Sequence, residues 1–126
     1  MARLLLDTHT LLWWLDDPNQ IAAPAREAVA EGENEVYVSA ASAWEVAIKS
    51  ALGKLSAPDD LEGAMESAGF AALPITVRHA LAVRTLPDVH RDPFDRILAA
   101  QAKVEGLTLV TRDARLGQYG AAVMPA

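Results

Sequence analysis

Short runs of apolar and β-branched residues recur along the chain, and longer segments with a helical period separate them. The runs typical of buried strands are 3–6, 35–40, 70–75, 107–111 and, as a further candidate, 121–125. Alternation of short strands with helices predicts a three-layer α/β/α sandwich around a parallel sheet of four to five strands.

Proline and glycine mark the ends of the intervening helices: Pro24 and Pro93 stand in first turns, and Gly106 follows a last turn. The predicted helices or helical turns are 8–17, 24–32, 42–55, 59–68, 76–86, 92–106 and 113–120. Within 42–55, the large side chains of Trp44 and Leu52 belong to one apolar stripe, the pattern of a helix that packs by one face.

Composition narrows the class of protein. The chain has 126 residues, of which 52% are hydrophobic, so we expect a single folded domain over residues 1–126. It contains no cysteine, which excludes disulfides, zinc–thiolate sites and a cysteine nucleophile. The first residues do not resemble a signal peptide, and no apolar run is long enough to span a membrane. We therefore expect a cytoplasmic protein without a membrane partner.

The formal net charge is −6, which argues against broad electrostatic capture of nucleic acid. It does not exclude a nucleic-acid enzyme that binds through metal ions and a local basic patch. The charge is unevenly distributed, because the last third of the chain contains Arg91, Arg96, Lys103, Arg112 and Arg115.

Four acidic residues stand near one predicted edge of the sheet. Asp7 and Asp113 follow strands, Glu45 comes shortly after the second strand, and Asp95 opens the helix that leads into 107–111. In open α/β sheets, ligands bind beyond the carboxyl ends of the strands, where the strand order reverses. We therefore expect the four carboxylates to lie close together.

Each acid also has a local structural interpretation. Asp7 and Asp113 suit helix N-caps, Asp92 suits the N-cap before Pro93, and Glu45 suits a helical pair with Lys49. Four converging carboxylates would nevertheless repel one another, and a divalent cation would remove that conflict. Carboxylate oxygens favour Mg²⁺ or Mn²⁺ over zinc, and such a metal indicates phosphate-ester chemistry.

Four stretches together resemble a known family: "LLLDTHTLLWWL", "SAASAWEVAIKSALGKL", "HRDPFDRILAAQA" and "LTLVTRDARLGQYG". They span nearly the whole chain, which is similar to the PIN-domain ribonucleases, in particular the VapC-type toxins of bacterial toxin–antitoxin pairs. The resemblance implies a PIN-like fold and a metal-dependent endoribonuclease that uses Mg²⁺ or Mn²⁺. It also implies an RNA substrate, a homodimer and an antitoxin protein that holds the enzyme inactive.

The resemblance carries over to individual residues. It implies catalytic roles for Asp7, Glu45, Asp95 and Asp113. Asp7, Asp95 and Asp113 would bind the metal, and Glu45 would position or deprotonate the attacking water. The implied accessory residues are Asp92, Thr8 and Thr111.

Basic residues near the acids have open roles. Arg91, Arg96 and Arg112 flank the acids, and we interpret them either as phosphate contacts or as ordinary surface charge. The three histidines, His9, His79 and His90, are scattered, and each is expected to be a polar surface residue or a support for a site residue. His9 stands out because it lies two residues after Asp7.

Three other functions compete with this interpretation. A phosphatase of the haloacid-dehalogenase type needs a second acid two residues after the first, and His9 holds that position. A receiver domain needs an aspartate after the third strand, and none follows 70–75. A PIN-fold binding module without catalysis stays open as the non-enzymatic alternative.

Trp13 and Trp14 are adjacent on a predicted helix, where neighbouring side chains point about 100° apart. One is expected to pack inward, which leaves the other exposed or covered by a partner. Burial of both between layers is the alternative. Because aromatic residues are enriched at interface hot spots, we name Trp13 and Trp14 as candidate antitoxin contacts.

Overall fold

The computed structural model describes residues 1–89 and 91–126 and contains a five-stranded, fully parallel sheet in the order β3-β2-β1-β4-β5. The strands are β1 (Arg3–Leu6), β2 (Glu35–Ser39), β3 (Ala71–Leu73), β4 (Thr108–Thr111) and β5 (Ala122–Pro125). The predicted parallel sheet is thus confirmed, and the fifth candidate strand is part of it.

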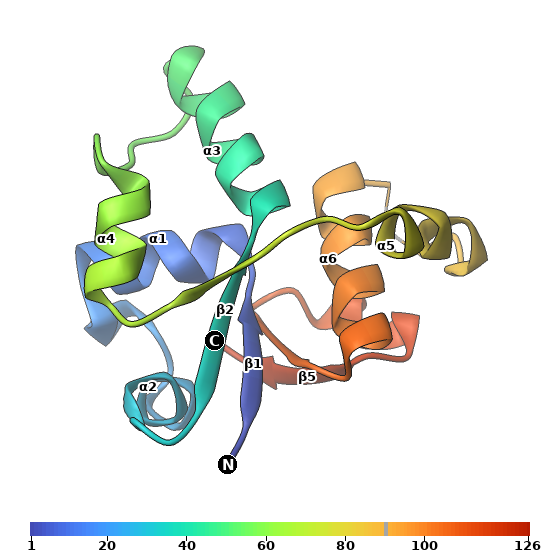
Figure 1. Ribbon diagram of the computed structural model, residues 1–126, viewed down its shortest axis with the longest axis horizontal. Coiled ribbons are helices and arrows are strands. Elements are labelled where there is room, and N and C mark those ends of the chain that lie inside the picture. Colours follow the sequence, from blue (N-terminus) through green and yellow to red (C-terminus); the bar gives the residue numbers. More distant parts are fainter. Residues whose placement is uncertain (90) are drawn as a thin grey trace.

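Helices cover both faces of the sheet, so the predicted three layers are confirmed (Figure 1). The α-helices are α1 (Thr8–Asp16), α2 (Ala23–Ala30), α3 (Ala40–Ala51), α4 (Leu61–Ser67), α5 (Val77–Ala82) and α6 (Pro93–Glu105). The 3₁₀ helices are η1 (Pro18–Gln20), η2 (Val83–Thr85) and η3 (Ala114–Tyr119). In Figure 1, α1, α2 and α4 lie on one side of the sheet, and α5 and α6 lie on the other.

The central strand β1 anchors both cores. Leu4 and Leu6 pack with α1 and α2 in one hydrophobic cluster, and Leu5 packs with α6 in the other. All three leucines are completely buried, each worth about 1.5–3 kcal/mol of transfer free energy. β1 pairs with β2 on one side and with β4 on the other, so the strand order reverses at this strand.

The apolar stripe of α3 does not pack as its pattern suggested. Trp44 and Leu52 are 62% and 63% exposed, and Ile48 is exposed as well. The buried face of α3 instead contains Ala41, Ser42, Glu45 and Val46. The reason is visible in Figure 1, where α3 extends beyond the edge of the sheet and the two helical layers leave its outer face uncovered.

The histidines do not all lie at the surface, as the sequence suggested. His79 is 1% exposed; its Nδ1 accepts from the backbone N–H of Thr76 at 3.0 Å, and its Nε2 lies 3.1 Å from Glu105. It therefore closes the N-terminal turn of α5 and ties it to α6. His9 is exposed, and His90 lies outside the described residues.

Candidate active site

Asp7 stands where β1 ends and α1 begins. As the N-cap of α1, its Oδ1 accepts a hydrogen bond from the backbone N–H of Thr10 at 2.8 Å, and the residue is only 7% exposed. Its own backbone N–H donates to the carbonyl oxygen of Val110 in β4 at 3.1 Å. The cap and the strand pairing together fix a nearly buried carboxylate at the switch point of the sheet.

Thr111 connects Asp7 to Asp113. Its hydroxyl donates to Asp7 Oδ2 at 2.6 Å and accepts from the backbone N–H of Asp113 at 3.1 Å. Thr111 is 1% exposed, so this short bond to a carboxylate lies in a region of little water. The two acids that follow β1 and β4 are therefore held together by one hydroxyl group.

Glu45 lies on the buried face of α3 and pairs with Lys49, whose Nζ is 2.5 Å from Glu45 Oε2. The pair has the predicted spacing of four residues, but it is not an ordinary surface pair, because the Glu45 side chain is only 6% exposed. Nearby, the Thr8 hydroxyl donates to Ser42 Oγ at 3.1 Å, which joins α1 to α3.

Asp92 and Asp95 open α6, whose first turn lies at the same edge of the sheet as the start of α3 (Figure 1). Asp92 Oδ1 accepts from the backbone N–H groups of Phe94 at 2.9 Å and Asp95 at 3.4 Å, so Asp92 is the N-cap. The Phe94 ring meets the Trp44 ring edge-on, with centroids 5.3 Å apart. This contact fixes the beginning of α6 against α3.

Two cations lie among the acids. The hydrogen bond to Glu45 raises the pKa of the Lys49 ammonium group, and the charge of Asp95 contributes to the same shift. The hydrogen bond to Asp113 raises the pKa of the Arg115 guanidinium, and Asp95 contributes there too. Asp95 is therefore electrostatically coupled to both cations, which join the helix-borne acids to the acid after β4.

Local hydrogen bonds and ion pairs thus account for each acid by itself, but they do not explain why the acids lie near one another. Asp113 caps η3 by accepting from the backbone N–H of Arg115 at 3.0 Å, and it also pairs with the Arg115 guanidinium at 2.8 Å. A capping residue does not need to be buried, whereas Asp7 and Glu45 are. Two buried carboxylates beside two further acids are an arrangement that a bound cation stabilises.

The donor set fits a hard divalent ion in its chemistry, because it consists of carboxylate and hydroxyl oxygens. Within residues 1–89 and 91–126, however, no group of three or more His, Asp or Glu side chains has a geometry that could hold a metal ion as it stands. In the structure, Lys49 pairs with Glu45, Arg115 pairs with Asp113, and the Thr111 hydroxyl donates to Asp7. A metal would have to compete with the two cations.

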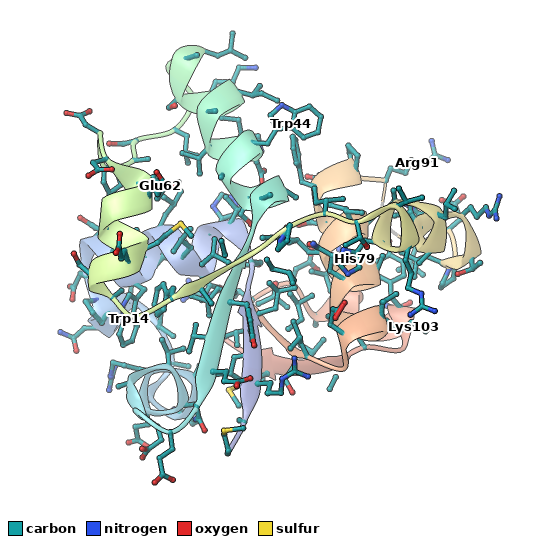
Figure 2. All side chains as sticks on the ribbon, in the orientation of Figure 1. Trp14, Trp44, Glu62, His79, Arg91 and Lys103 are labelled. Carbon is teal, nitrogen blue, oxygen red and sulfur yellow. The ribbon has the colours of Figure 1, made fainter. Side chains whose placement is uncertain are left out.

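The three arginines named from the sequence differ in their surroundings. Arg112 donates to the carbonyl oxygens of Gln20 at 2.6 Å and Ala126 at 3.2 Å, and Arg96 donates to backbone carbonyls at the end of α5 and in the following loop. Arg91 is exposed and points away from the body of the molecule (Figure 2). The structure gives Arg96 and Arg112 structural bonds and leaves Arg91 directed to solvent.

The two adjacent tryptophans are both half-buried against the same hydrophobic cluster. Trp14 lies beside Phe70, with ring centroids 6.2 Å apart. Trp13 stacks with His9 at 5.9 Å and lies under the Arg112 guanidinium at 3.9 Å. Neither of the two expected arrangements is found, because neither side chain is fully buried and neither is fully exposed.

Sequence reasoning missed three contributors to this site. Lys49 was recognised only as a helical partner, and Arg115 only as a basic residue, although both bond directly to candidate acids. Ser42 was not singled out, yet it is completely buried and bonds Thr8. The available signal for Ser42 was a small hydroxyl residue in the first turn after a strand, a pattern too common to select it.

Comparisons with known proteins identify the family of this chain. The model of the PIN domain family matches residues 4–122. The chain is 33% identical to "Ribonuclease VapC22" of Mycobacterium tuberculosis over an alignment that covers 94% of this chain and 93% of that protein.

Two solved structures share the fold. They are VapBC2 from Rickettsia felis bound to a promoter DNA fragment (TM-score 0.71, 14% identity, 98% of both chains) and DNA-bound VapBC from Salmonella typhimurium (TM-score 0.70, 17% identity, 99% of this chain and 98% of that one). The family match includes strands β2 to β4, most of β1 and all four candidate acids, and we conclude that the chain belongs to the PIN domain family.

Proposed function

We propose that this protein is a metal-dependent endoribonuclease that acts as the toxin of a toxin–antitoxin pair. The observation that carries the proposal is the buried Asp7, bonded through Thr111 to Asp113 at the switch point of a PIN fold. The relative named as a ribonuclease supports the RNA substrate. Membership of the PIN family also removes the phosphatase alternative.

In the proposed site, Asp7, Asp95 and Asp113 would hold Mg²⁺ or Mn²⁺, and Asp92, Thr8 and Thr111 would support them. Such an ion acidifies a bound water and stabilises negative charge on the reacting phosphate. The Thr111 hydroxyl orients the Asp7 carboxylate and restrains the backbone of Asp113. Lys49 pairs with Glu45, and Arg115 pairs with Asp113.

Glu45, whose carboxylate lies on the buried face of α3, would orient the attacking water and accept its proton. The water oxygen would bond to phosphorus, the bond from phosphorus to O3′ would break, and O3′ would take up a proton from solvent. The products are a 5′-phosphate and a 3′-hydroxyl. The Arg91 side chain points outward, so we assign the contact with a neighbouring phosphate to this arginine. Arg96 and Arg112 already donate hydrogen bonds to backbone carbonyls, so each would contact a phosphate only through its other N–H groups.

We place the antitoxin partner in a cavity of about 600 Å³ between α3 and α4. Its wall is rich in small and apolar side chains, including Ala43, Val46, Leu61 and Met65, which suits the apolar face of a peptide segment. Solved neighbours are complexes of VapBC type, which supports a protein partner. Of the two tryptophans, Trp13 is closer to this role, because it lines the cavity that adjoins this one at residues 57–58.

We place the predicted homodimer contact on the outer face of α3, where Trp44, Ile48 and Leu52 are exposed. Figure 2 shows Trp44 projecting from α3 on the side that faces α6. Leu52→Asp would make the association unfavourable. We expect light scattering to give twice the chain mass for the unaltered protein and the chain mass for this variant; a chain mass for both would contradict the dimer.

The proposed function is tested by metal-controlled cleavage of single-stranded RNA. We expect the purified protein to be inactive after treatment with EDTA, to recover with Mg²⁺ or Mn²⁺, and to leave 5′-phosphate ends. Cleavage undiminished by EDTA would contradict the proposed mechanism. Stable RNA binding without cleavage under any of these conditions would instead favour the non-catalytic binding module. Among the residues that the structure describes, no helix is long and apolar enough to cross a lipid bilayer.

A further inference from the structure

A second cavity, of about 580 Å³, runs along α1. Its helical wall begins at His9, two residues after Asp7, and its opposite wall is the segment 55–58. At about 1.5 Å of rise per residue, the stretch from Asp7 to Trp13 spans only about 9 Å along the helix axis. The cavity therefore begins within one helical turn of Asp7 along the α1 axis, and Asp7 itself is not among its lining residues.

Two stacked rings line this cavity. His9 and Trp13 are four residues apart on α1, and their ring centroids are 5.9 Å apart with an interplanar angle of 30°. The Arg112 guanidinium lies 3.9 Å from the Trp13 ring centroid, and two backbone carbonyls fix it there. His9 is exposed, so it is the ring of this stack most open to a ligand.

A simple helical pair accounts for only part of this arrangement. Side chains four residues apart on a helix often contact one another, and such a pair requires neither a cavity nor a cation on the ring. The third member, Arg112, comes from the segment between Thr111 and Asp113, the two residues that bond to or form the candidate metal site. The stack is thus attached to the active site from two directions, through α1 and through the end of β4.

The chemistry of the cavity selects the kind of ligand. Asp16 contributes a carboxylate to the wall, which would repel a phosphate group placed there. A nucleobase is uncharged and stacks on aromatic and guanidinium groups, as bases of single-stranded RNA do in proteins that bind it. A base can stack on the rings and is not repelled by Asp16, whereas a phosphate beside Asp16 would be.

We propose that His9 and Trp13, supported by Arg112, form a stacking subsite for the base of a nucleotide next to the scissile phosphate. This subsite rests on the proposed ribonuclease function, since it places the RNA with its phosphate at Asp7 and its neighbouring base along α1. It makes His9 and Trp13 determinants of substrate affinity and position. Their side chains take no part in proton transfer.

The test measures binding without turnover. In the Asp7→Asn background, a short fluorescent single-stranded RNA that contains the mapped cleavage site is titrated and followed by anisotropy. Base stacking is worth about 1–3 kcal/mol, so we expect His9→Ala and Trp13→Leu each to weaken binding by about 5- to 150-fold. His9→Phe and Trp13→Phe, which keep a ring, should restore most of the affinity.

Removing bases from the RNA provides the matched test. RNA with an abasic nucleotide at one position beside the cleaved bond should bind the protein that retains His9 more weakly than intact RNA does. This loss of affinity should equal the loss that His9→Ala causes with intact RNA. That same abasic RNA should bind the His9→Ala protein with no further loss. Trp14→Phe is the protein control, because Trp14 packs beside Phe70 and does not line the cavity.

The outcomes separate the inference from the proposed function. Unchanged RNA affinity in His9→Ala and Trp13→Leu overturns the subsite, and it does so even if these variants bind the antitoxin more weakly. A clear stacking contrast in binding, together with no metal-dependent cleavage by the protein with Asp7 intact, overturns the nuclease and retains the subsite. An abasic penalty that is unchanged by His9→Ala also overturns the assignment.

Discussion

The candidate active site has two halves that are stabilised in different ways. In the strand-end half, Asp7 and Asp113 are joined by the hydroxyl of Thr111. In the helix half, the buried Glu45 is paired with Lys49, and the ammonium group of Lys49 also interacts electrostatically with Asp95. The first half is held by buried hydrogen bonds and by one exposed ion pair, between Asp113 and Arg115, whereas the second half is held by a largely buried ion pair.

The largest effect is expected from Asp7→Asn, which removes a charge from the strand-end half and keeps its shape. Metal-dependent RNA cleavage should fall by more than roughly 100-fold, because even partners of metal ligands contribute about 10–100-fold. Asparagine caps helices as well as aspartate does, so the melting temperature should change little.

Asp7→Ala is the matched control for that variant. It should lose cleavage equally and also lose about 1 kcal/mol of unfolding free energy, because alanine cannot cap α1. Cleavage retained in Asp7→Asn would show that the strand-end half does not hold the catalytic metal.

The next largest effect is expected from Thr111→Val, which removes the hydroxyl between Asp7 and Asp113. The affinity for Mn²⁺ should fall about 10- to 100-fold, and unfolding free energy should fall by about 1–3 kcal/mol because a buried carboxylate loses its donor. Thr111→Ser keeps the hydroxyl and should retain most metal affinity. Calorimetric titration compares the three proteins, and equal affinity in the valine and serine variants would contradict this role.

A smaller effect, of opposite sign, is expected from Lys49→Met in the helix half. The charge of Lys49 acts on Asp95 and would repel a divalent ion, so removing it should lower the Kd for Mn²⁺ about two- to fivefold, a change of up to about 1 kcal/mol. Lys49→Arg keeps the charge and should bind the metal like the parent. Weaker Mn²⁺ binding by Lys49→Met would mean that Lys49 supports the metal site and does not compete for it.

The smallest effect is expected from Arg115→Ala. Its ion pair with Asp113 is exposed to water and therefore screened, so the Kd for Mn²⁺ should decrease by less than about twofold. The same titration at low and high salt checks this, because the small gain should vanish as salt rises. A gain larger than that of Lys49→Met would reverse the comparison between the two halves.

The sequence predicted the strand-end half better than the helix half. Asp7 and Asp113 could be placed because apolar strands precede them, and parallel strands bring such ends to one edge. The link through Thr111 depends on side-chain direction at the end of β4, for which a single sequence has no signal. The role of Lys49 toward Asp95 depends on how α6 approaches α3, which is a tertiary feature.

Fold prediction failed in places for a related reason. The period of α3 correctly showed an apolar stripe through Trp44 and Leu52, but periodicity does not say whether the same chain covers it. Likewise, a lone histidine carries no local signal of burial, and His79 is buried only because α5 packs against α6. Local patterns predicted the elements; contacts between distant elements decided which faces were buried.

The central claim is that the acids at the edge of the sheet share one divalent ion, and a direct Mn²⁺ titration of the parent protein and Asp7→Asn tests it without RNA. The account predicts saturable binding by the parent protein and an affinity at least about tenfold weaker in the variant. Equal Mn²⁺ affinity in the two proteins, with both correctly folded, would contradict it.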